Sequence, residues 1–186
     1  MTGPSVVASA PIRTLAAVVV ALAAGMTARA EPKVAAPLEP LKFLLGEWEA
    51  GANTGPHGQG SGACAFALSL QDQVIVRTNH AEYPASGSAP ALVHDDLMVI
   101  YASPAGIEAH FYDNEHHLIH YVVSVPGPGQ AVFVSEAQTA APRYRLTYEL
   151  ADNGALTGRF EVAPPDKPEA FARYLAWESR RAAPRR

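Results

Sequence analysis

The chain has little cysteine, few long apolar runs and no excess of basic residues. A single cysteine, Cys64, in 186 residues excludes an intramolecular disulfide, so a domain of this length must be held by its apolar core. The formal net charge is −4, and the only basic cluster lies at the C-terminus. An acidic chain without a basic patch argues against nucleic-acid binding. No hydrophobic segment follows residue 30, so the sequence predicts no stable membrane anchor.

The one long apolar run lies at the N-terminus. It extends without a charge from Thr14 to Thr27 and follows a single basic residue. A transmembrane helix needs about 20 apolar residues, so this run is too short for an anchor and has the length of a signal peptide. Ala28-Arg29-Ala30 offers a small-x-small cleavage site. We therefore expect residues 1–30 to be a cleaved signal peptide and the mature protein to be periplasmic or secreted.

The rest of the chain predicts one all-β domain. Residues 31–40, rich in Pro and Ala, indicate a linker, 41–180 the domain, and 181–186 a basic tail. After a short helical turn at 41–45, apolar runs with period two recur about every 8 to 12 residues between turn-forming residues. This pattern favours a single antiparallel meander β-barrel of about ten strands. The expected strands are 46–53, 60–70, 73–82, 94–102, 106–112, 117–125, 130–136, 143–150, 155–162 and 171–179.

Two connections carry specific expectations. Residues 113–116 predict a type I turn in which His116 takes a positive φ, and this turn pairs His110 with His120 and Tyr112 with Leu118. Because side chains alternate along a strand, His110, Tyr112 and His120 then share one face. The longest connection within the barrel, Pro84 to Val93, is a candidate lid over one mouth.

Several segments together resemble a known family. They are Leu41–Trp48, which places Gly-x-Trp after a short turn, His94–Tyr101, Phe111–Tyr121, Pro142–Tyr148 and Ala163–Pro168. They are similar to a bacterial family of lipocalin-like (calycin, nitrobindin-type) barrel domains of unknown function. The resemblance covers residues 40–180 and implies a barrel of about ten strands around a cavity. It implies no reaction.

The same resemblance raises the question of haem. Nitrobindin-like proteins ligate haem iron through a histidine near the C-terminus, but the last expected strand, Phe171–Ser179, contains no histidine. We therefore expect no cofactor.

Aromatic and polar residues on separate strands are the candidate ligand-binding residues. An aromatic wall and core packing are both open for the aromatic set, while Arg77 either binds an anion in the lumen or lies on the outer face beside Asn79. His110 and His120 supply two zinc ligands without an evident third, which leaves a solvated outer face or a cavity lining. The candidates are Trp48, Arg77, Tyr101, His110, Tyr112, His120 and Tyr148.

Other motifs fail on their context, so no catalytic or metal site is predicted. Gly58–Gly62 has Gln59 where a nucleophile elbow needs glycine, and a strand follows it where a phosphate loop needs a helix. His94-Asp95-Asp96 is interpreted as the start of a strand near the barrel rim, and Cys64 as a small core residue.

Three functions remain open at this level. The first is an exported protein that binds a small apolar or amphipathic ligand in the barrel. The second is an enzyme, an isomerase or hydrolase, that uses a lumen histidine as general base on such a ligand. The third is an envelope interaction protein with a solid barrel. A lumen filled by side chains would exclude the first.

Overall fold

The structure is a computed structural model, and it describes residues 35–183. The expected signal peptide, the first four residues of the expected linker and the last three residues of the chain lie outside this range. Within it, no helix is both long and apolar enough to cross a membrane.

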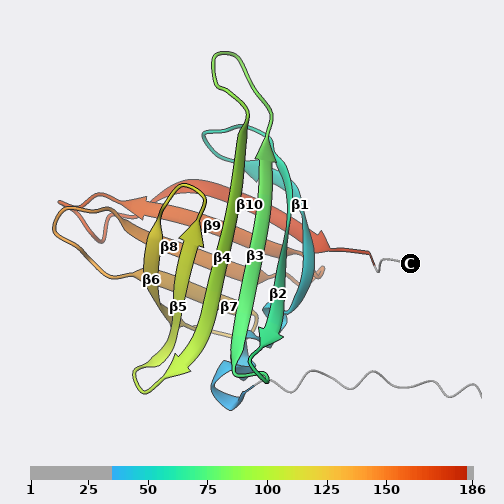
Figure 1. Ribbon diagram of the computed structural model, residues 1–186, viewed down its shortest axis with the longest axis vertical. Helices are drawn as coiled ribbons and strands as arrows, with labels where there is room; N and C mark the ends of the chain where they lie inside the picture. Colours follow the sequence, from blue (N-terminus) through green and yellow to red (C-terminus); the bar gives the residue numbers. More distant parts are fainter. Residues whose placement is uncertain (1–34, 184–186) are drawn as a thin grey trace, which may run out of the picture. The chain divides into compact units, whose positions relative to one another are not determined.

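The described chain forms a closed antiparallel barrel of ten strands, each bonded to its neighbours in sequence, with β1 closing onto β10 (Figure 1). This confirms the all-β meander. The strands are β1 Gly46–Thr54, β2 Ser61–Ser69, β3 Val74–Tyr83, β4 Leu92–Ser103, β5 Gly106–Asp113, β6 Leu118–Ser124, β7 Gln130–Ser135, β8 Arg143–Leu150, β9 Leu156–Ala163 and β10 Ala172–Arg181.

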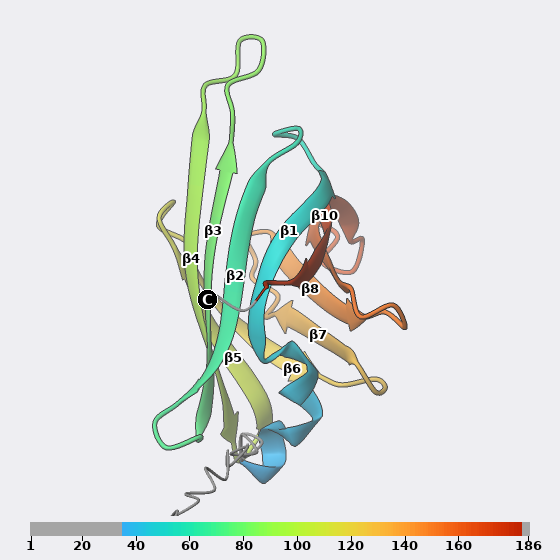
Figure 2. The same ribbon diagram turned by 90° about the vertical axis from the view of Figure 1, so that its right-hand side faces the viewer.

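One 3-10 helix, η1 (Ala36–Leu44), precedes the barrel. It begins within the stretch that we expected to be a linker, so that boundary was wrong. Pro37 stands at its start, where a missing N–H is harmless, and Pro40 lies inside it, which favours tight turns over a regular α-helix. Its leucines at 38, 41 and 44 are fully buried. The helix therefore closes one end of the barrel (Figure 2).

Trp48 completes this closed end. Its indole is fully buried, and its Nε1–H donates a 2.8 Å hydrogen bond to the carbonyl oxygen of Leu44. The guanidinium of Arg181 lies 4.4 Å from the centre of the Trp48 ring and donates to the carbonyl of Leu45. Arg181 is thus the last residue of β10 and a structural contact, not part of a basic tail.

The inward-facing residues change character along the barrel axis. On β3 they run from Ile75, which is fully buried, to Arg77 and Asn79. On β4 they run from Ile100 through Met98 to Asp96 and His94. The half next to η1 is a packed apolar core, and the other half holds polar groups around a hollow. The buried apolar core includes Phe66, Ile75, Met98, Ile100, Ala109, Phe133 and Tyr148.

The β5–β6 turn has the predicted geometry. His116 has a φ of 71°, and His110 pairs with His120 as Tyr112 does with Leu118. The predicted lid differs from expectation. The β3–β4 hairpin projects beyond the other strands, and of residues 84–93 only Leu92, the first residue of β4, lines the cavity (Figures 1 and 2). A bridge between Ser86 and Ala89 holds its tip as a two-stranded extension, which explains why it does not fold over the mouth.

We expect Leu41→Ala to lower the free energy of unfolding by about 2–5 kcal/mol, because the truncated side chain leaves a cavity that the closed end cannot refill. Urea denaturation measures the change. Leu118→Ala is the matched control, since Leu118 is 66% exposed on β6, and its effect should stay within about 0.5 kcal/mol. Equal effects of the two variants would show that η1 does not seal the barrel.

Candidate functional site

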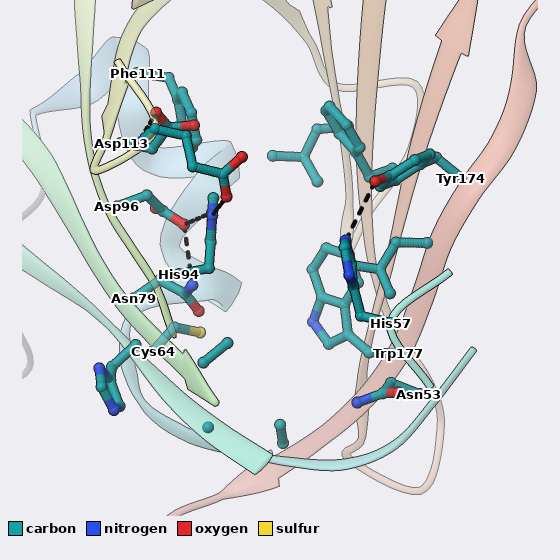
Figure 3. A pocket seen from close by; sticks show the side chains of 18 of the residues that line it. Asn53, His57, Cys64, Asn79, His94, Asp96, Phe111, Asp113, Tyr174 and Trp177 are labelled. Carbon is teal, nitrogen blue, oxygen red and sulfur yellow. Dashed lines mark hydrogen bonds and ion pairs between the residues drawn. The ribbon is translucent and has the colours of Figure 1, made fainter. Parts of the chain in front are cut away.

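A cavity of about 360 Å³ occupies the hollow half of the barrel. Its two walls differ in chemistry, as Figure 3 shows. Polar and acidic side chains of β3, β4 and the β5–β6 turn face aromatic side chains of β8, β9 and β10. The volume lies at the lower end of the range for small-molecule sites, so the cavity suits one compact molecule.

A buried ion pair forms the inner part of the polar wall. The Arg77 guanidinium donates through Nη1 to Asp96 Oδ1, and their side chains are 6% and 3% exposed. Asn79 Nδ2 donates to Asp96 Oδ2 at 3.0 Å. Burial disfavours the charged guanidinium, but Asp96, together with Tyr148 and Cys64, outweighs this effect, and the pKa of Arg77 is raised above its ordinary value. The guanidinium of Arg77 therefore stays charged in the buried pair.

His94 continues this network toward the mouth. Its Nε2 lies 3.3 Å from Asp96 Oδ2 and its Nδ1 lies 2.9 Å from Glu115 Oε1. The hydrogen bond to Asp96, together with that to Glu115, raises the pKa of His94 to about 9 against the opposing effect of burial. The imidazole is consequently protonated at neutral pH and uses both N–H groups within the protein.

The β5–β6 turn holds the acidic rim in place. The Oδ1 atom of Asp113 accepts the backbone N–H groups of Glu115 and His117, and its Oδ2 lies 2.7 Å from His117 Nδ1. Burial favours the protonated acid, but the bonds from His117 and Glu115 prevail and lower the pKa of Asp113. Asn114 ties the turn to β4 through the backbone of Val93 and Asp95.

The aromatic wall lies opposite. Tyr144 stacks on Phe160 with ring centres 5.7 Å apart, and Tyr174 meets the edge of Phe160 at 6.2 Å. Trp177 on β10 is paired with Gly158 on β9, where any Cβ would collide with the indole ring. Gly158 therefore makes room for the indole against the sheet. Burial, and then the charge of Asp113, raises the pKa of Tyr144.

His57, in the β1–β2 connection, lies at the mouth. Its ring contacts Tyr83 at 5.4 Å and Tyr174 at 6.5 Å between centres, and its Nε2 lies 3.4 Å from the Tyr174 hydroxyl. Asn53 anchors this connection by two hydrogen bonds. Its side-chain Nδ2 donates to the backbone carbonyl of Gly60, and its backbone carbonyl accepts from the Gln59 side chain. The glycine-rich segment is thus a connection between strands, as predicted, and it carries a residue of the cavity rim.

The inner end of the cavity holds Cys64 next to Arg77. Burial raises the pKa of the Cys64 thiol, which stays neutral and is a poor nucleophile. Beside it, the Nε of Arg77 and the hydroxyl of Tyr148 are buried, with no hydrogen-bond partner among the described residues. This end therefore packs polar groups tightly and offers no activated nucleophile.

Of the predicted site residues, only Arg77 lines the cavity. Arg77 faces the lumen and not the outer face, and its partner there is Asp96. Trp48 and Tyr148 are fully buried in the apolar half. They belong to the core.

The other four predicted residues lie on the outer face, so their assignment to the cavity is corrected. On β5 and β6 the buried positions are Ala109, Ile119 and Tyr121, which sends the alternate residues outward. There Tyr101 stacks on His110 at 5.7 Å, His110 lies 4.9 Å from His120, and Tyr112 is 46% exposed. The corrected residues are Tyr101, His110, Tyr112 and His120.

Sequence reasoning missed the residues that form the two walls. One signal was present, because His94 and Asp96 share the inward face of β4 with Met98 and Ile100 in a period-two pattern. Cross-strand pairing of Asn79 with Asp96 was not derivable from local sequence alone. The missed lining residues are Asn79, His94, Asp96, Asp113, Glu115, His117, Tyr144, Phe160 and Tyr174. Within residues 35–183, no three metal-ligating side chains converge on one point.

Removing one partner of the buried ion pair should cost far more than removing both. We expect Asp96→Asn to destabilise the protein by about 3–5 kcal/mol in urea denaturation, because it leaves the Arg77 guanidinium buried without a counter-charge. The double variant Arg77→Met with Asp96→Leu should lie closer to the wild type. A double variant that is less stable than Asp96→Asn would contradict this account.

His94 makes stability depend on pH. Its folded pKa of about 9 lies above the ordinary value near 6.5, so its contribution is complete below about pH 6.5 and is lost as pH rises to about 9. The difference in unfolding free energy between the wild type and His94→Gln should therefore shrink across this window. Urea denaturation at several pH values measures it, and a constant difference would refute the assignment.

Comparison with known proteins adds no functional assignment to this geometry. No protein-family model and no curated protein sequence matches the chain. The lipocalin-like family resemblance accordingly stays a prediction.

Proposed function

We propose that this protein binds one small amphipathic molecule in the barrel cavity and does so as an exported, periplasmic or secreted protein. The observation that carries the proposal is the 360 Å³ cavity with one polar and one aromatic wall. The apolar N-terminal run supports export.

The build of the cavity supports binding over simple packing. In the half of the barrel next to η1, the lumen is filled by fully buried side chains such as Ile75, Ile100 and Phe133. The same sequence therefore fills one half of its lumen and leaves the other half hollow. In the hollow half, the inward positions of β2 and β3 include Gly62 and Ala81, whose small size leaves space between the two walls of the cavity. A hollow lined by aromatic rings and a few fixed polar groups is typical of a small-molecule site. The solid barrel of the third hypothesis lacks this support.

An enzyme is the second candidate, and one pair of residues favours it. His117 is oriented by Asp113 through Nδ1 at 2.7 Å, as a general base is oriented by a carboxylate. Both residues line the cavity. His110 and His120, the earlier candidates for this role, lie on the outer face and cannot supply it. His94 is protonated and suits an acid better than a base.

The neutral fluorescent probe N-phenyl-1-naphthylamine tests the proposal. We expect saturable binding with a fluorescence increase, and a loss of affinity of at least about tenfold in Ala81→Phe, because the added ring fills the cavity between its walls. Ala67→Phe places the same ring on the outer face of β2 and should bind as the wild type does.

Two results would count against binding as the function. If the probe shows no saturable binding, or if both alanine variants behave alike, the cavity is not the binding site. Native mass spectrometry of the purified protein separates the two candidates. A retained molecule of constant mass supports a binding protein, whereas conversion of that molecule by the wild type but not by His117→Gln supports an enzyme.

A further inference from the structure

We infer that the cavity selects molecules with a protonated amine over those with a carboxylate, and that Glu115 and the aromatic wall hold the amine at the mouth. This inference rests on the proposed function. It follows from which charged groups of the cavity are already paired and which are not.

On the polar wall, the basic groups of Arg77, His94 and His117 are each already paired with a carboxylate. Arg77 is paired with Asp96 in a nearly unexposed ion pair. His94 spends its two ring nitrogens on Asp96 and Glu115. The ring of His117 is bonded to Asp113. An entering carboxylate would therefore compete with a carboxylate of the protein for each of these groups, and displacing Asp96 would leave it buried and unpaired, which is costly.

Among the carboxylates, one keeps free capacity. Asp96 accepts from Arg77, Asn79 and His94, and Asp113 accepts three bonds within its own turn. Glu115 differs from them. Its Oε1 is bonded to His94, while its Oε2 has no hydrogen-bond partner within residues 35–183. Its side chain is 44% exposed. The under-used charged group of the cavity is therefore an acceptor at the mouth.

The aromatic wall, opposite the polar wall, offers ring faces as a second favourable contact for a cation. Tyr144, Phe160 and Tyr174 present a continuous set of ring contacts, and the faces of such rings attract ammonium groups. Figure 3 shows Tyr174 across the cavity from Asp113 and His94. Because Glu115 is half open to water, an amine bound here keeps part of its hydration, which limits the cost of its burial.

Glu115 is also held in position before any ligand arrives. Asn114 bonds to the backbone of Val93 and Asp95, so the turn is fixed to β4 on one side. His94 holds the carboxylate itself on the other. A pre-organised acceptor loses little conformational entropy on binding, and this favours its use in recognition.

Three probes with one apolar body test the selection. They are 2-(aminomethyl)naphthalene, 2-(hydroxymethyl)naphthalene and 2-naphthoate, measured by isothermal titration calorimetry at pH 7 and low salt. We expect the amine to bind most tightly and the carboxylate at least about tenfold more weakly than the amine. The alcohol should lie between them.

Glu115→Gln assigns the preference to its residue. It keeps the acceptor oxygen for His94 and removes the charge, so the affinity for the amine should fall about fivefold to tenfold while that for the alcohol stays unchanged. Glu82→Gln is the control, because it removes the same charge from an exposed position on the outer face of β3. It should leave all three affinities unchanged.

The possible outcomes separate this inference from the proposed function. If the carboxylate binds as tightly as the amine or more tightly, or if Glu82→Gln weakens amine binding as much as Glu115→Gln does, the selection is refuted while the cavity remains a binding site. If none of the three probes binds, and N-phenyl-1-naphthylamine fails as well, the proposed function is lost and the inference with it.

Discussion

The buried pair of Arg77 and Asp96 is the interaction on which the rest of the site depends. It sits where the apolar core ends and the cavity begins, with Ile75 and Met98 next along the same strands toward η1. Two charges in such a place are tolerated only because each neutralises the other and Asn79 and His94 complete the bonding of the carboxylate. The pair thus turns the inner end of the cavity into a fixed polar surface.

This pairing also decides what the cavity can recognise. A lone arginine in a barrel lumen would be a natural anchor for a carboxylate or phosphate, which is what the sequence allowed for Arg77. Once Asp96 occupies its guanidinium, that role is closed, and His94 loses the same capacity by bonding to two carboxylates. The positive charges of the cavity are held in internal ion pairs, and recognition in our proposal depends on Glu115 and the aromatic rings.

The fold could be predicted from the sequence because its signals are local. Turn residues and period-two runs marked the ten strands, and the Asp113–His116 turn fixed one register that the structure confirms. The walls of the site could not be predicted from the sequence, because they depend on which face of each strand points inward. That choice is global: the outward placement of His110 and His120 follows from the burial of Ala109 and Ile119 against strands far away in sequence. Arg77 was among the predicted site residues because the sequence left both the lumen face and the outer face open for its side chain.

Stability and recognition are separated along the barrel axis, and this separation has a physical basis. One end of the barrel is sealed by Leu38, Leu41, Leu44 and Trp48. Most of the apolar burial that stabilises the fold therefore lies on the η1 side of the ion pair between Arg77 and Asp96. The hollow half buries fewer apolar residues. It is lined by small inward-facing residues, by the acidic β5–β6 turn that is bonded to β4, and by aromatic rings. Side chains at the mouth can therefore vary without loss of the core that holds the ten strands together. A barrel built in this way can keep one fold while the chemistry of its open end changes.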